Sequence, residues 1–154
     1  MFIAFIGLQN AGIIVNNDAT LISLGNITSG SALLKTYDTW QEGFLAIFHL
    51  LKKDEPFVVN IYHNAPRGYI YRYLYKVTYQ LIYNVLEEKA ADMVVREEDK
   101  AFIADFYKYG FVGLVLEWID KGMKEDPKQI IERLNALIQG SFAHALNNAK
   151  LNRS

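Results

Sequence analysis

The stretch that decides the fold covers residues 106–130 and reads FYKYGFVGLVLEWIDKGMKEDPKQI. Wound as a helix, its first half is apolar on almost every side. Gly122 is placed to end that helix, and Asp126 followed by Pro127 is a typical start for the next one. A helix that is apolar on two sides has to bury both, one against its own core and the other against a partner. The stretch therefore favours a helical module that pairs with a second chain over a catalytic domain.

The composition narrows the class of protein. A chain of 154 residues is long enough for one domain with a substantial core. Its net charge of -1 provides no general attraction to nucleic acid. The absence of cysteine excludes disulfides and thiolate metal sites, and the three histidines, His49, His63 and His144, are scattered along the sequence. We therefore expect no metal and no cofactor.

Residues 1–34 differ from the rest of the chain in charge. They contain one charged residue, Asp18, whereas the remainder contains all 16 basic residues and 16 of the 17 acidic ones. Short apolar runs separated by Asn and Gly predict strands or irregular structure here rather than a helix. The polar interruptions argue against a membrane span, and the lack of a basic start argues against a signal peptide. We therefore expect a cytoplasmic protein with no membrane partner.

From Asp38 onward the apolar residues recur with a helical period. Thr39 and Glu42 form a capping-box pattern, and an apolar face from Trp40 to Leu51 follows it. The chain is therefore predicted to be an all-α helical bundle with an irregular N-terminal segment. Its helices, about five in number, are expected near residues 40–53, 56–62, 69–90 and 100–121, with a last helix from Asp126 that frays into the polar tail at Asn147.

The aromatic and glycine pattern of residues 106–127 resembles a known family. The nine positions that carry the resemblance are Phe106, Tyr107, Gly110, Gly113, Trp118, Ile119, Gly122, Met123 and Pro127. The segment resembles the C-terminal regulatory domain of TetR/AcrR-like transcriptional regulators, in the variant that includes regulators of dihydroxyacetone kinase operons in low-GC Gram-positive bacteria. The resemblance divides the chain into an atypical N-terminal segment (1–36), a regulatory and dimerisation domain (37–147) and a polar tail (148–154).

The resemblance implies a homodimer. In that family the last two helices pack with those of a second subunit, and here they are the helices starting near Lys100 and at Asp126. This agrees with the excess of apolar surface in residues 106–130. Trp118→Asp or Leu134→Asp is then expected to yield monomer or aggregate. The residues expected at the dimer interface are Tyr107, Gly110, Phe111, Leu114, Trp118, Ile131, Leu134, Ile138 and Phe142.

The chain departs from the family at its N-terminus. Such regulators begin with a helix-turn-helix domain, whereas residues 1–34 show no such pattern and no Lys or Arg to neutralise phosphates. DNA binding is therefore expected only through a helix-turn-helix domain that is not seen in this chain. Three explanations compete: a truncated or frame-shifted gene, a natural stand-alone regulatory domain, or a chain that begins mid-protein with foreign residues.

A second group of residues suggests an effector site. Tyrosines, a histidine and arginines gather around the second and third predicted helices, where the resembled family has its effector pocket. Aromatic walls with a few polar groups suit a small, partly apolar ligand, although tyrosines at such positions also serve an ordinary core. A partner protein is the other effector that the resemblance implies. The candidate ligand-binding residues are Tyr62, His63, Tyr71, Arg72 and Tyr75, with Arg67 nearby.

No catalytic pattern accompanies these residues. His63 lacks the serine, aspartate or paired carboxylates of a catalytic site, and the sequence contains no phosphate-binding or metal-binding motif. The chain is therefore expected not to be an enzyme. The sequence predicts the sensing and dimerisation portion of a TetR-family transcriptional regulator. The alternative is a small-molecule-binding helical dimer with no direct role in transcription.

Overall fold

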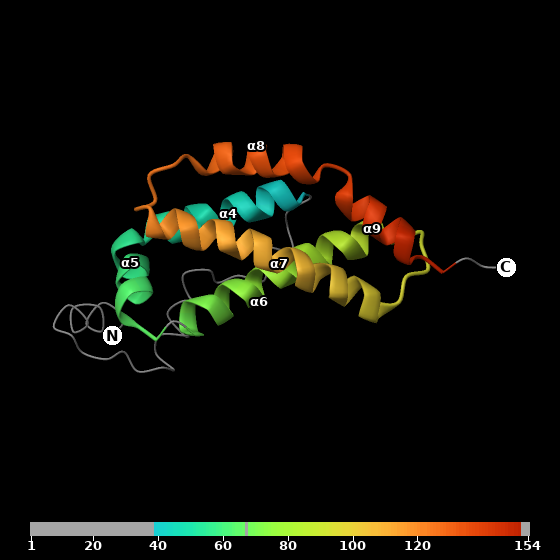
Figure 1. Ribbon diagram of the computed structural model, residues 1–154, viewed down its shortest axis with the longest axis horizontal. Coiled ribbons are helices and arrows are strands. Elements are labelled where there is room, and N and C mark those ends of the chain that lie inside the picture. Colours follow the sequence, from blue (N-terminus) through green and yellow to red (C-terminus); the bar gives the residue numbers. More distant parts are fainter. Residues whose placement is uncertain (1–38, 67, 152–154) are drawn as a thin grey trace.

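The computed structural model describes residues 39–66 and 68–151, and this part of the chain is all helical. Figure 1 shows how its six helices are arranged. They are α4 (Trp40–Lys53), α5 (Glu55–Asn64), α6 (Gly68–Lys89), α7 (Glu97–Asp120), α8 (Pro127–Ile138) and α9 (Ser141–Ala149). The all-α prediction is confirmed. The irregular structure predicted for residues 1–34 lies outside the described residues.

Side-chain caps fix where two of the helices begin. The hydroxyl oxygen of Thr39 accepts a hydrogen bond from the backbone N–H of Glu42 at 3.2 Å, so the predicted cap of α4 is present. The carboxylate of Asp126 accepts from the backbone N–H of Lys128 at 3.0 Å, and Pro127 occupies the first turn of α8. Both starts follow directly from the local sequence.

The corner between α7 and α8 has the form expected from Gly122. This glycine has a φ of +83°, and its N–H donates to the carbonyl of Ile119 at 3.0 Å. The N–H of Met123 donates to the carbonyl of Trp118 at 2.8 Å, which completes the pair of bonds of a Schellman motif. The Trp118 indole N–H also donates to the carbonyl of Glu125 at 2.9 Å. Backbone and side-chain bonds therefore both hold the corner.

The last predicted helix is in fact two helices. The apolar period continues from Ile138 to Phe142, so the sequence predicts one helix through this point. In the structure α8 ends at Ile138 and α9 begins at Ser141, with Gly140 between them at a φ of +77°. Glycine adopts this left-handed conformation without the steric cost that a side chain adds. Beyond the turn, Phe142 and Leu146 of α9 are buried in the core.

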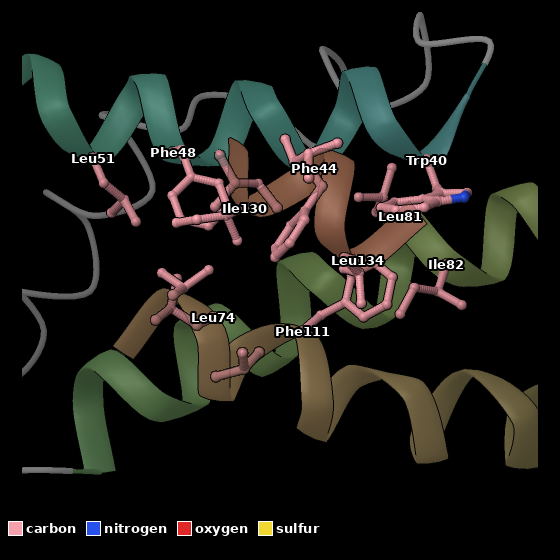
Figure 2. Close-up of a cluster of buried hydrophobic side chains, with 14 of the residues drawn as sticks. Trp40, Phe44, Phe48, Leu51, Leu74, Leu81, Ile82, Phe111, Ile130 and Leu134 are labelled. Atoms are coloured by element: carbon pink, nitrogen blue, oxygen red, sulfur yellow. The ribbon is translucent and has the colours of Figure 1, made fainter. Parts of the chain in front are cut away.

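The core lies between α4 and the helices around it. Figure 1 shows α4 between α8 and the crossed pair of α6 and α7. Aromatic rings fill this space: the ring of Phe44 lies 4.9 Å from that of Phe48 and 4.8 Å from that of Phe111. The ring of Trp40 lies 5.3 Å from Phe111. Figure 2 shows these rings beside aliphatic side chains from α6 and α8. Buried residues of α5 and α9 belong to the same cluster, so all six described helices share one core.

Candidate functional site

Five of the nine predicted interface residues lie in the core of this chain. The ring of Phe111 packs 5.3 Å from that of Trp40, and the ring of Trp118 packs 4.9 Å from that of Phe48. These side chains leave almost no surface exposed, so each of them packs in the core of this chain. An aspartate at Trp118 or Leu134 is therefore expected to disrupt the fold itself. The five buried residues are Phe111, Trp118, Ile131, Leu134 and Phe142.

The other four predicted interface residues line a groove between α7 and α8. Tyr107, Leu114 and Ile138 are half-buried, and Gly110 is exposed. Together with Leu137 of α8, which is 81% exposed, they line a groove of about 500 Å³. The walls of this groove are almost entirely apolar. The groove is therefore suited to pack against an apolar surface of another molecule.

A row of exposed residues runs along α7, and Phe106, Tyr109 and Gly110 of this row also line the groove. Phe102, Phe106 and Tyr109 are 73%, 67% and 58% exposed, and Gly110 and Gly113 are exposed as well. These five residues, termed the outer stripe, recur at helical spacing on the side of α7 that faces away from the core. Of the outer stripe, only Gly110 belongs to the dimer interface predicted from the sequence. Spacing alone does not tell which of the two apolar sides of α7 faces inward.

A second groove adjoins the first and has a charged edge. It has a volume of about 430 Å³ and shares three leucine side chains with its neighbour. Ion pairs at 3.0 Å join Lys121 to Glu117 and Arg133 to Glu125 along its edge. The two grooves therefore adjoin between α7 and α8, and five charged residues line the second one near the corner. The shared residues are Leu114, Leu134 and Leu137.

Three of the five predicted ligand-binding residues meet at a polar hollow of about 310 Å³. Tyr62, His63 and Tyr71 line it, together with Asp120 from the end of α7. The Tyr62 hydroxyl donates a hydrogen bond to Asp120 Oδ1 at 3.2 Å, and its ring lies 5.1 Å from the His63 ring. Sequence reasoning missed Asp120, because it lies 58 residues from Tyr62 and carries no local signal. The hollow joins α5, α6 and the C-terminal end of α7.

The other two predicted ligand-binding residues, Arg72 and Tyr75, do not line this hollow. The Nε of Arg72 donates to the carbonyl of Gly68 at 3.1 Å, and its guanidinium lies over a neighbouring tyrosine ring. Tyr75 packs its ring 5.3 Å from that of Tyr109 on α7. Both side chains are therefore engaged in contacts along α6 and α7. Arg67 lies outside the described residues.

A lysine is enclosed by tyrosines where α6 meets α7. The Nζ of Lys108 lies 5.8, 5.7 and 5.1 Å from the ring centres of Tyr75, Tyr79 and Tyr109. It also donates to Asp105 Oδ1 at 2.8 Å, and this hydrogen bond raises the pKa of Lys108 above its ordinary value. Sequence reasoning missed this cluster, although tyrosines recur every four residues along α6. Because Lys108 fills the space between the rings, the cluster fastens α6 to α7.

Two kinds of feature are absent from the described part of the chain. Within residues 39–66 and 68–151, no group of three or more His, Asp or Glu side chains is arranged to hold a metal ion. In the same ranges, no helix combines the length and the apolar character needed to cross a membrane.

Comparisons with known proteins give two kinds of match. Residues 38–140 match the family described as transcriptional regulator C-terminal region. A short stretch is 59% identical over 34 residues to the adenine permease AdeP of Escherichia coli, and 51% identical over 37 residues to the guanine/hypoxanthine permease PbuG of Bacillus subtilis. These matches cover 22% and 24% of this chain, which spans 8% of the length of each permease. No solved structure matches the chain.

Proposed function

Because the chain belongs to the family of transcriptional regulator C-terminal regions, we propose that residues 37–147 form the dimerisation and effector-sensing part of a TetR-family regulator. The observation that best supports this proposal is the exposed outer stripe of α7. A row of large apolar side chains on the surface is explained by a partner that covers it. The proposed role is regulatory and not catalytic.

The size of the exposed apolar surface supports a homodimer. Aromatic side chains bury about 150–250 Å² each when covered, so the outer stripe and Leu137 together present on the order of 500 Å². Contiguous apolar patches on monomers rarely exceed a few hundred Å², and a standard interface buries about 800 Å² on each side. The outer stripe and the adjoining groove would therefore supply most of one side. The proposed interface residues are Phe102, Phe106, Tyr107, Tyr109, Gly110, Gly113, Leu114, Leu137 and Ile138.

The hollow at Tyr62 is the proposed effector site. Tyr62, His63, Tyr71 and Asp120 present hydrogen-bonding groups beside the apolar Ile70, which suits a small, partly apolar ligand. The Tyr62–Asp120 hydrogen bond joins α5 to the end of α7, the helix that carries the outer stripe. A ligand that takes over the Tyr62 hydroxyl would release this connection. If the ligand binds the arrangement without this hydrogen bond more tightly than the one with it, ligand binding would change the geometry of the dimer. A partner protein is the second candidate effector.

We also infer that the permease-like stretch is residues 1–37. The matches are 34 and 37 residues long, and only 14 residues (154 − 140) follow the family match, so the N-terminal segment alone can hold them outside residues 38–140. No transport of purines is assigned to this chain. DNA contact would need a helix-turn-helix domain, for example that of an intact relative paired with it.

Sedimentation velocity tests the dimer. The chain is expected to sediment as a dimer at micromolar concentration. Phe106→Asp is expected to sediment as a monomer with an unchanged helical circular dichroism spectrum, because the carboxylate would be buried at the interface and not in the core. Asn147→Asp adds the same charge at an exposed site of α9 and should remain a dimer. A wild-type chain that stays monomeric would contradict the proposal.

Gel-shift assays address the link to transcription. The chain alone is not expected to shift promoter fragments, because residues 1–34 carry no basic residue. Specific binding below micromolar concentration would show that this expectation is wrong. Added to an intact relative, the chain is expected to form mixed dimers and weaken that relative's promoter binding. The alternative, a ligand-binding helical dimer with no direct role in transcription, predicts no such change.

A further inference from the structure

We propose that α7 of one chain crosses α7 of a second copy at Gly110 and Gly113, so that the two-fold axis of the dimer passes beside these glycines. The inference rests on the proposed dimer and specifies where and how its two chains meet. It follows from the two glycines, from the side chains around them and from the groove beside them.

Nothing in the described chain explains why these two positions are glycine. Both lie in the interior of α7, where glycine favours a helix less than every other residue except proline. A Cβ added at Gly110 or Gly113 would meet no atom within 4 Å. Gly43 of α4 shows the opposite case, since a Cβ there would lie 2.3 Å from a methyl carbon of Leu81. The bare surface at Gly110 and Gly113 is therefore best explained by a contact outside the described residues.

The surroundings of the glycines indicate another helix as that contact. Gly110 and Gly113 are about one turn apart on the same side of α7, and Phe106 lies about one turn before them. Helices usually pack with their axes about 8–10 Å apart, a distance that depends on the side chains at the contact. Without side chains at the crossing point, two helix backbones can approach more closely. Phe106 and Tyr109 then cover the apolar surface on one side of the crossing.

A second copy of α7 fits this surface. The outer stripe carries no charge, so it offers nothing that would select an oppositely charged partner. A two-fold interface needs one patch that complements itself. This patch has both halves, because the exposed Phe106 stands at the edge of the groove of about 500 Å³ that it helps to line. When two antiparallel copies cross between Gly110 and Gly113, Phe106 of one chain lies opposite the turn from Leu114 to Glu117 of the other, where the two grooves meet. We therefore expect Phe106 to fill the groove of its partner.

Cysteine cross-linking tests the crossing point. The chain contains no cysteine, so a single introduced cysteine reports on one position. Gly110→Cys and Gly113→Cys are each expected to give disulfide-linked dimers on oxidation with copper phenanthroline, because a disulfide requires Cα atoms about 4.4–6.8 Å apart. Ala143→Cys, at an exposed site of α9, is the control and should remain unlinked.

The outcomes distinguish a wrong crossing point from the absence of a dimer. If the two glycine variants sediment as dimers and neither cross-links, the crossing point is wrong and the dimer stands. If the wild-type chain is monomeric, the dimer and the crossing point both fail. Cross-linking of both glycine variants but not of Ala143→Cys supports the proposal.

Alanine at the same positions gives an independent measurement. Gly113→Ala has space for its methyl group within the chain and favours the helix, so the monomer should unfold at a higher urea concentration. The same methyl group would hold the second α7 away, so the dimer should dissociate about tenfold more readily, equivalent to about 1.4 kcal/mol. Ala143→Gly, the matched control, should lower stability and leave dissociation unchanged. A more stable Gly113→Ala monomer with unchanged dimer dissociation would overturn the proposal.

Discussion

The two sides of α7 are both apolar, and they differ in what covers them. On the inner side, Phe111, Val115 and Trp118 are at most 3% exposed, and their neighbours come from α4 and the other helices of the core. On the outer side, Phe102 and Phe106 are 73% and 67% exposed, and no described element of the chain covers them. Apolar periodicity therefore measures how much surface must be buried. It does not tell whether the same chain or a second one buries it.

The largest effect is expected when a phenylalanine on the inner side of α7 is replaced, and a phenylalanine on the outer side provides the comparison. Phe111→Ala removes a ring packed against Trp40 and Phe44, and we expect the free energy of unfolding to fall by about 3–5 kcal/mol. Phe106→Ala removes an exposed ring, so the unfolding free energy of the monomer should change by about 0.5 kcal/mol or less. Urea unfolding at concentrations low enough to keep both variants monomeric measures the two values. Equal losses would show that the two sides of α7 do not differ as described.

Much of the fold could be predicted because helix caps and stops act within about one turn. Thr39, Gly122 and Asp126 begin or end helices where the sequence indicates. The break at Gly140 was not predicted, because a left-handed glycine leaves the apolar period of its neighbours intact. The inner side of α7 was not identified either. Its partners on α4 lie far away in the sequence, so no local signal distinguishes it from the outer side.

The ligand-binding prediction was limited by helix geometry. Tyr62 and His63 end one helix and Tyr71 begins the next, so a short connection brings them to one hollow. Arg72 follows Tyr71 by one residue, and this step turns its side chain about 100° around α6. Tyr75 lies about one turn, or about 5.4 Å, further along the helix. Clustering in sequence therefore overestimated how many of these residues share one site.

An intermediate effect on the free energy of unfolding is expected when the inward-facing Gly43 is replaced. A methyl group at Gly43 of α4 would lie 2.3 Å from Cδ1 of Leu81, which is 1% exposed and has little room to move. Gly43→Ala is therefore expected to cost about 1–3 kcal/mol of unfolding free energy. On the outer side, Gly113→Ala should stabilise the monomer by up to about 1 kcal/mol. Urea unfolding of both variants measures the difference in sign, and a stabilised Gly43→Ala would refute the close approach of α4 to α6.

The smallest expected effect concerns a charged contact of α7, near its N-terminal end. The Nζ of the buried Lys100 lies 2.7 Å from carboxylate oxygens of both Glu87 and Glu97, and the Tyr83 hydroxyl donates to Glu97. The hydrogen bond from Lys100, followed by that from Tyr83, lowers the pKa of Glu97 below its ordinary value of 4.5. A carboxylate with a lowered pKa adds stability above its ordinary pKa and loses that contribution as the pH falls through its folded pKa.

Lys100→Met removes the main cause of the lowered pKa of Glu97. The decline of Tm as the pH falls below 4.5 should therefore be shallower in this variant than in the wild-type chain. The difference should be small, because Glu97 is largely exposed and water screens its charge. Lys128→Met removes the same charge from an exposed site of α8 and should keep the wild-type slope. If Lys100→Met declines as steeply as the wild type, the contact adds nothing to stability, and the buried side of α7 is held by its apolar groups alone.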